Sequence, residues 1–264
     1  MVRTLATICA DEQDQQELKV ALITALLRLS IGEDSKLRKQ IVDAGALPAL
    51  VKVMATRLGV FADDLQHCAA GCLGCIARGD DASREAVLES GAIAALCQSL
   101  DFNSEVVVQQ ECCTALANVM WNNVDAVATV RDLGGVAKFL ERIEYKNVEV
   151  MNEEKWFALQ DAACGALVNM CIADEGEGER SVSDLIGRDG KDKLSKFVHG
   201  ASNEPAARKA VQLLEKCGIK GVGTRGLFID KVKSVVMGII IWRMCQVRSI
   251  LFTTVNVEKL MNSC

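Results

Sequence analysis

The stretch "REAVLESGAIAALCQSL", residues 84–100, decides the fold of this 264-residue chain. An apolar pattern with helical spacing stops at Gly91, and a second one starts directly after it. Glycine at such a break permits the positive φ of a helix C-cap and a sharp turn. Two further stretches read alike, "RKQIVDAGALPALVKVM" at 38–54 around Gly45 and "VATVRDLGGVAKFLERI" at 127–143 around Gly134. The chain is therefore built from repeats.

A second motif alternates with the first. It reads "CCTALANVMWNN" at 112–123, with copies at 69–80 and 163–174 and weaker copies at 22–32 and 207–218. Alignment places Arg28, Cys75, Asn118, Asn169 and Leu213 in one column, in steps of 47, 43, 51 and 44 residues. The step of 51 is long because residues 144–160 lengthen the loop or helix before the motif. A period of roughly 40–47 built from helices is typical of armadillo or HEAT arrays.

The aligned columns also predict a core. A repeat of this size cannot bury both faces of its helices alone, so neighbouring repeats must stack. Small residues in one column let helices approach closely. The predicted core columns are Leu73, Leu116 and Leu167, then Ile76, Val119 and Met170, with the small residues Cys72, Ala115 and Ala166.

The stretches "DAGALPALVKVM", "ESGAIAALCQSL", "TALANVMWNN" and "GALVNMC" resemble the armadillo repeat family. The resemblance covers residues 15–218, about three full repeats between two partial ones. It implies an all-α, right-handed superhelical solenoid with three helices per repeat. It also implies that the third helices line a concave groove that binds extended peptides or partner proteins. We therefore expect an armadillo-like domain at 1–218 and a separate tail at 219–264.

Charge and cysteine content narrow the class of protein. The net charge of −5 combines −10 in residues 1–218 with +5 in the tail. An acidic body disfavours nucleic-acid binding and favours basic or polar partners. The twelve cysteines lie mostly in apolar helical runs, where a free thiol behaves as a small hydrophobe. The apolar core of the first residues is too short for a signal peptide, so we expect a reducing compartment, the cytoplasm or the nucleus.

The tail differs from the repeats. It contains Gly221, Gly223 and Gly226 in a G-x-G-x-x-G pattern, but without a βαβ unit this is a linker rather than a phosphate site. The apolar run "SVVMGIIIW" at 234–242 is too short to span a membrane, which needs about 20 residues. Two interpretations of the tail remain open: a helix with basic flanks that lies in a membrane interface, or a cap that packs over the last repeat.

Metal and catalytic sites have little support. "HCAAGCLGC" at 67–75 contains His67 and three cysteines on one helical face, but one helix cannot readily wrap a metal, and Cys72 aligns with two alanines. Small core residues explain this stretch better than a zinc or redox site. No nucleophile or phosphate-loop motif occurs. We expect no catalytic residues, no metal and no cofactor, and no small-molecule ligand is evident.

The predicted groove is the best functional candidate. If Asn118 and Asn169 face it, residues one and two turns earlier share that face. The predicted partner-binding residues are Asn118, Asn169, Gln110, Glu111, Thr114, Asp161, Trp121 and His67. In the family, such an Asn hydrogen-bonds the backbone of an extended peptide. The alternative is that these Asn side chains bridge neighbouring helices. Importin-α-type receptors place a Trp four residues before the Asn, where this chain has Thr114 and Gly165, so the resemblance does not extend to nuclear-signal recognition.

Two functions follow from these observations. The first is a non-catalytic scaffold or adaptor that binds an extended, basic or polar segment of a partner protein in the groove. The second is a membrane-peripheral armadillo protein that attaches through the basic, apolar tail. We favour the first.

Overall fold

The computed structural model describes residues 16–32, 35–55, 61–101, 105–144, 153–174, 182–200 and 203–219. All of them lie in one compact unit, residues 1–222. Every regular element in these ranges is an α-helix, so the all-α prediction is confirmed. The N-terminal residues 1–15 and nearly all of the predicted tail lie outside the described residues.

The helices follow one another in sets of three. After α2 (Gln16–Ile31), the first set is α3 (Ser35–Asp43), α4 (Ala46–Met54) and α5 (Ala62–Ala77). The second is α6 (Asp81–Glu89), α7 (Ala92–Asp101) and α8 (Val106–Met120). The third is α9 (Val124–Asp132), α10 (Gly135–Ile143) and α11 (Glu153–Asp174). The last described helices are α12 (Val182–Gly200) and α13 (Glu204–Lys216).

The break between first and second helices depends on glycine. Gly45, Gly91 and Gly134 have φ of 78°, 76° and 73°, in the left-handed region that L side chains rarely adopt. The predicted turns are therefore confirmed. Gly187 also has a positive φ, 66°, and interrupts α12, so the last set contains a break between its first and second helices as well. Its ψ of 178° differs from the ψ of 31° at Gly45 and 22° at Gly134, so the turn has another geometry. Sequence comparison did not find this break.

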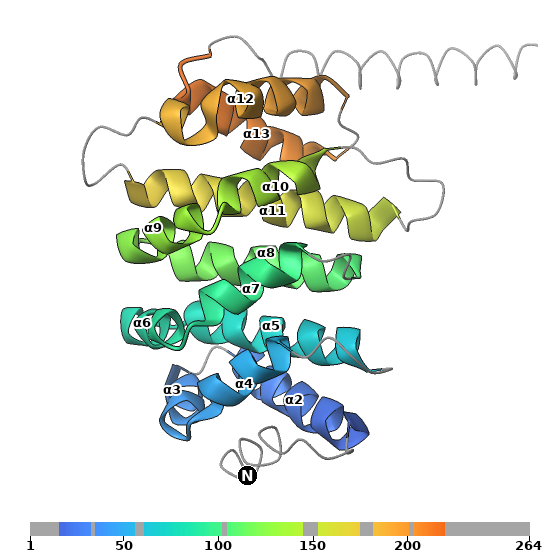
Figure 1. Cartoon of the computed structure of the whole chain (residues 1–264), viewed down its shortest axis with the longest axis vertical. Coiled ribbons are helices and arrows are strands. Elements are labelled where there is room, and N and C mark those ends of the chain that lie inside the picture. Colours follow the sequence, from blue (N-terminus) through green and yellow to red (C-terminus); the bar gives the residue numbers. More distant parts are fainter. Residues whose placement is uncertain are drawn as a thin grey trace, which may run out of the picture. The chain divides into compact units, whose positions relative to one another are not determined.

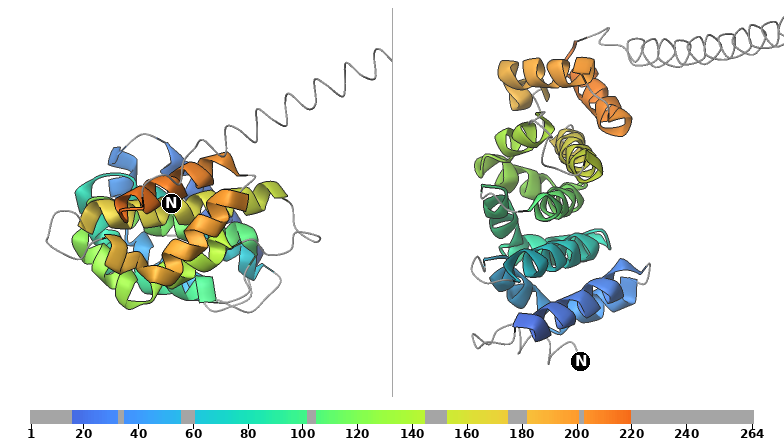
Figure 2. Two further views of the ribbon diagram at one scale, coloured as in Figure 1. Left: turned by 90° about the horizontal axis from the view of Figure 1, so that it is seen from above. Right: turned by 90° about the vertical axis from the view of Figure 1, so that its right-hand side faces the viewer.

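The third helices stack directly on one another. α5 packs on α2, α8 on α5, α11 on α8 and α13 on α11. Figure 1 shows α2, α5, α8 and α11 as successive layers. The right-hand view of Figure 2 shows the shorter first and second helices on one side of this stack. One face of the third helices therefore remains available to a ligand.

The predicted core columns are confirmed. Leu73, Leu116 and Leu167 are fully buried, as are the Ile76 and the Ala115 columns. The small residues allow close approach: a Cβ on Gly74 would lie 3.1 Å from the Ala115 Cα. This contact holds α5 and α8 at short distance, as ridge-into-groove packing requires.

The long step before Asn169 extends a helix. α11 has 22 residues, whereas α8 has 15. Aligned on Asn118 and Asn169, four of the seven additional residues lie at the N-terminal end, and they include Trp156, whose side chain is almost fully buried. Gln160 adds a link by donating from Nε2 to the Ile143 carbonyl oxygen at 3.1 Å. α11 therefore extends beyond α8 at its N-terminal end and gives α13 a surface on which to pack.

Candidate functional site

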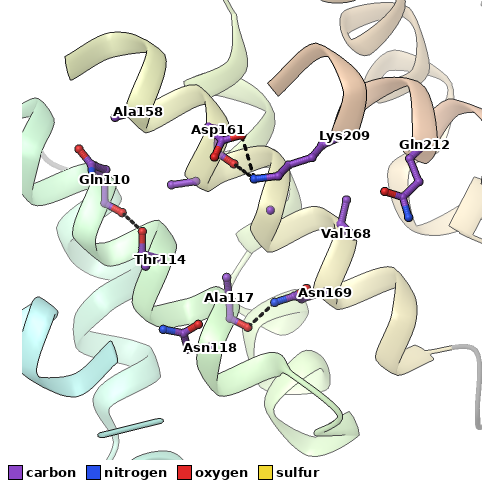
Figure 3. Close-up of a pocket in the computed structure, with 12 residues that line it drawn as sticks. Gln110, Thr114, Ala117, Asn118, Ala158, Asp161, Val168, Asn169, Lys209 and Gln212 are labelled. Atoms are coloured by element: carbon purple, nitrogen blue, oxygen red, sulfur yellow. Dashed lines mark hydrogen bonds and ion pairs between the residues drawn. The ribbon is translucent and has the colours of Figure 1, made fainter. Parts of the chain in front are cut away.

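A groove lies on the face of the third helices that the core leaves uncovered. Its cavity volume is about 460 Å³. Figure 3 shows that its side chains come from α8, α11 and α13. They are Gln110, Thr114, Ala117, Asn118, Ala158, Asp161, Ala162, Gly165, Val168, Asn169, Lys209 and Gln212. Five of the predicted residues are among them; Glu111, Trp121 and His67 are not.

The two Asn side chains bridge neighbouring helices and also line the groove. Asn118 Nδ2 donates to the Gly74 carbonyl oxygen of α5 at 3.0 Å. Asn169 Nδ2 donates to the Ala117 carbonyl oxygen of α8 at 2.8 Å. The alternative in which these Asn side chains bridge neighbouring helices is therefore confirmed, and the amide nitrogen makes the bridge. The Oδ1 atom of each residue makes no hydrogen bond within the described ranges and remains an acceptor.

These two bonds also verify the alignment of the repeats. Each Asn donates to the carbonyl of the residue that precedes its own column in the previous repeat, Gly74 before Cys75 and Ala117 before Asn118. Because the contact repeats, the two Asn amides occupy equivalent positions along the groove.

Asp161 does not present a free negative charge to the groove. Lys209 Nζ lies 2.8 Å from Asp161 Oδ1 and donates to the Asp161 backbone oxygen at 3.2 Å (Figure 3). The lysine reaches back from α13 over Gly165, where a Cβ would be 3.5 Å from Nζ. Asp161 and Lys209 are about one-third exposed. Of the two acidic residues among the predicted partner-binding residues, only Glu111 therefore has no cation paired to it among the described residues.

Glu111 lies beside the groove, over the preceding third helix. Its Oε2 would be 3.6 Å from a Cβ on Gly71 of α5. Burial raises the pKa of the Glu111 carboxyl, and the nearby His67 imidazole opposes that rise. No hydrogen bond or ion pair joins Glu111 to another described residue. His67 Nδ1 is buried and has no hydrogen-bond partner among these residues.

Known proteins identify the repeat. The sequence model of the Armadillo/beta-catenin-like repeat matches residues 80–121. The ARO (armadillo repeats only) protein from Plasmodium falciparum has a similar structure, with a TM-score of 0.65 at 15% identity over 82% of this chain and 92% of that one. The described residues have the armadillo repeat fold.

Designed armadillo proteins share the same fold. One, solved in complex with the peptide (KR)4, has a TM-score of 0.65 at 20% identity and covers 82% of this chain and 81% of its own. Another, from a set designed for modular peptide recognition, has a TM-score of 0.65 at 21% identity over 84% and 90%. At these identities the likeness shows the armadillo fold alone.

A curated relative matches over a shorter range. Protein CELLULOSE SYNTHASE INTERACTIVE 3 from Arabidopsis thaliana is 32% identical over 88 residues, 33% of this chain. The matched part is 4% of the relative's length.

Trp121 lies at the end of its armadillo helix rather than in the groove. It is the extended C-cap of α8, and its backbone N–H donates to the Asn118 carbonyl oxygen. The side chain is 46% exposed. Asn122 follows with φ 50°, so the chain turns sharply toward α9. Trp121 is therefore accessible on the surface at the C-terminal end of α8.

The cysteines of the armadillo repeats are packing residues. Cys72, Cys112, Cys113 and Cys164 are fully buried. Burial raises the pKa of Cys113 to about 12 and that of Cys112 well above its ordinary value, so the thiols stay protonated near neutral pH. No group of three or more His, Cys, Asp or Glu side chains among the described residues could hold a metal ion. None of the described helices is long and apolar enough to cross a membrane.

Sequence comparison missed the contribution of α13. Lys209 and Gln212 line the groove, yet neither was predicted. The alignment contained the necessary signal, because Lys209 stands four residues before Leu213, in the column of Thr114 and Gly165. Extending the groove-facing pattern to the weak last copy would have found it.

Proposed function

We propose that this armadillo-like protein is a non-catalytic scaffold that binds an extended segment of a partner protein along α8, α11 and α13. The observation that carries the proposal is the pair of Asn side chains in successive third helices. Both line the groove, and each keeps an Oδ1 acceptor free. An extended backbone presents N–H donors at regular intervals, which such acceptors can bind.

The dimensions suit an extended segment. Packed helices lie roughly 8–10 Å apart, which corresponds to two or three residues of an extended chain at roughly 3.3 Å per residue. The groove volume of about 460 Å³ is within the range of specific ligand sites. The designed armadillo protein that was solved with (KR)4 supports a peptide ligand for this fold.

The test is selection of random octapeptides on the immobilised protein, followed by affinity measurement on two variants. Ala162→Phe fills the groove without removing a hydrogen bond, and Asn118→Ala removes one acceptor. Both should weaken selected peptides, by about tenfold or more for the groove-filling change. Gln98→Ala, which removes an exposed amide on α7, is the matched control. Peptides that bind all variants equally would refute the groove as the binding site.

A reducing compartment remains part of this proposal. The nine cysteines of the described residues are all free, which suits the cytoplasm or nucleus. Imaging of a fluorescent fusion tests this, and accumulation in a secretory compartment would contradict it.

The membrane-peripheral alternative rests on the composition of residues 219–264, with net charge +5 and the apolar run 234–242. Flotation with phosphatidylserine vesicles tests it. If the tail attaches the protein, the full chain floats and a chain ending at residue 218 does not. Equal recovery of the two chains would exclude the tail as an anchor.

A further inference from the structure

Four carboxamide side chains line the groove along α8, α11 and α13. Gln110 and Asn118 extend from α8, Asn169 extends from α11 and Gln212 extends from α13. Figure 3 shows Gln110 and Gln212 toward opposite sides of the groove, with the two Asn side chains between them. The remaining uncharged lining is a threonine, a valine, a glycine and alanines. Amides are therefore the main uncharged hydrogen-bonding groups of the groove.

The two Gln side chains are available to a ligand. Neither carboxamide forms a hydrogen bond with another described residue, because the Thr114 hydroxyl donates to the backbone oxygen of Gln110, at 3.0 Å. Gln110 is half-buried and Gln212 is exposed. Each carboxamide keeps both its N–H donors and its oxygen acceptor. Gln110 aligns with Asp161 and Gln212 aligns with Val168, so these amides are features of this groove rather than of the repeat.

The charges in the groove cancel each other. Asp161 and Lys209 are the only charged residues among those that line it, and Lys209 Nζ lies 2.8 Å from Asp161 Oδ1. Lys209 Nζ also donates to the Asp161 backbone oxygen at 3.2 Å, which holds the pair together. A charged side chain of a ligand would therefore lose water here without meeting a free opposite charge. Such a loss weakens binding.

A carboxamide side chain suits this lining better than a charged one. An ammonium group only donates hydrogen bonds and an ionised carboxylate only accepts them, whereas a carboxamide does both. Two carboxamides can therefore exchange a pair of hydrogen bonds. An extended chain places every second side chain on one face, about 7 Å apart, so several amides of one segment can meet the groove together.

We propose that the groove binds an extended segment whose inward side chains are uncharged carboxamides, Asn or Gln, and that Gln110 and Gln212 determine this specificity. The inference rests on the proposed function and narrows its partner to a neutral segment. The Asn118 and Asn169 acceptors remain available to the backbone of the same segment.

The test compares four fluorescent octapeptides, (Gln-Ser)4, (Glu-Ser)4, (Lys-Ser)4 and (norleucine-Ser)4. Fluorescence polarisation measures their affinity for the full-length protein at low and high salt, because salt screens the long-range attraction of Lys to an acidic protein. At high salt we expect (Gln-Ser)4 to bind at least tenfold more tightly than each of the others, the scale of one or two hydrogen bonds. Equal or tighter binding of the Glu or Lys peptide would overturn the proposal.

Two variants test the Gln side chains. Gln110→Met and Gln212→Met keep the length of the side chain and remove no hydrogen bond between described residues. Each should weaken (Gln-Ser)4 several-fold and leave (norleucine-Ser)4 unchanged or tighter. Gln98→Met, which changes an exposed amide on α7, is the matched control. If both groove variants keep the wild-type ratio between the two peptides, the Gln side chains do not determine the specificity.

Two further variants test the cancelled charges. Lys209→Met leaves Asp161 without its cation and should raise the affinity for (Lys-Ser)4 several-fold. Asp161→Asn frees the ammonium group and should do the same for (Glu-Ser)4. If neither variant changes the charge preference, neutrality of the groove is not its cause, and the proposal is wrong.

The outcomes separate this inference from the proposed function. If neither these octapeptides nor any from the random selection bind, or if binding ignores Ala162→Phe, the groove function itself fails. If selected octapeptides bind in the groove but are rich in Lys, Arg, Asp or Glu, the neutral specificity is wrong while the groove function stands.

Discussion

Replacing Asn118 by Asp tests the bond between successive third helices more sharply than replacing it by Ala. Asn118 Nδ2 donates to the Gly74 carbonyl oxygen at 3.0 Å in a partly buried site. Ala removes one neutral hydrogen bond, with an expected loss of about 1 kcal/mol. Asp places a carboxylate oxygen against that carbonyl, so two acceptors face each other without a donor. We expect a total loss of about 2–3 kcal/mol, since an unsatisfied buried group costs roughly 1–3 kcal/mol and a charged one more.

The helix dipole adds to this effect at one position. Asn118 lies in the last turn of α8, where a negative charge costs roughly 0.3–1 kcal/mol. Asn169 lies five residues before Asp174, the last residue of α11, and donates to the Ala117 carbonyl in the same way. Asn169→Asp should therefore lower the stability of the protein more than Asn169→Ala does, with little added cost from the helix dipole.

The assay must resolve single repeats, because a solenoid need not unfold in one step. Native-state hydrogen exchange of α5 and α8 amides, with urea denaturation in parallel, measures the change at Asn118. Gln98→Ala is the control for loss of an exposed amide. If the Asp and Ala variants are equally stable at both positions, the amide nitrogen is not the donor to the preceding helix, and the inferred register is wrong.

Three further predictions concern the turns, the carboxylate and the thiols. Gly91→Ala should cost roughly 1–2 kcal/mol in thermal or urea unfolding, because φ of 76° disfavours any Cβ although nothing lies within 4 Å to clash with it; an unchanged stability would contradict the strain argument. Glu111→Gln should stabilise the protein at pH 7. Because the pKa of Glu111 is raised in the folded state, ionisation of its carboxyl opposes folding, and the wild type loses stability as pH rises through that pKa. The gain should disappear as pH falls below it, and a gain that is constant with pH would refute this origin. Iodoacetamide should alkylate the partly exposed Cys217 well before the fully buried Cys113, whose pKa is about 12, and urea should abolish the difference; equal rates in the native protein would contradict the packing role.

The repeat pattern predicted most of the fold because the constraints are local and recur. Gly45, Gly91 and Gly134 mark a backbone conformation that favours glycine, so one residue type revealed three turns. The buried columns could be read from their spacing, since each repeat must place the same face against its neighbour. Gly187 also interrupts a helix with a positive φ, but the apolar pattern around it is weaker, and composition alone did not distinguish it from a loop glycine.

The site was harder to predict because its electrostatics depend on partners far apart in sequence. Asp161 and Lys209 are 48 residues apart, and nothing near Asp161 in the sequence indicates that its charge is neutralised. The pattern placed Asn118 on the correct face, but it could not show which atom of the amide faces the preceding helix. That choice depends on the position of one carbonyl oxygen across a helix interface, 44 residues away.

Bridging and ligand binding are compatible roles for the Asn side chains, because the two roles use different atoms. The bond from Nδ2 to the preceding helix fixes the side-chain rotamer before any ligand arrives. Ordering a free side chain on binding costs about 0.5–1.5 kcal/mol, and this cost falls when the group is already held. On the proposed function, the bond that joins two repeats also holds the Oδ1 acceptor in place for the ligand. Loss of that bond should therefore weaken binding even where Oδ1 is retained, which distinguishes a positioned acceptor from one that is merely present.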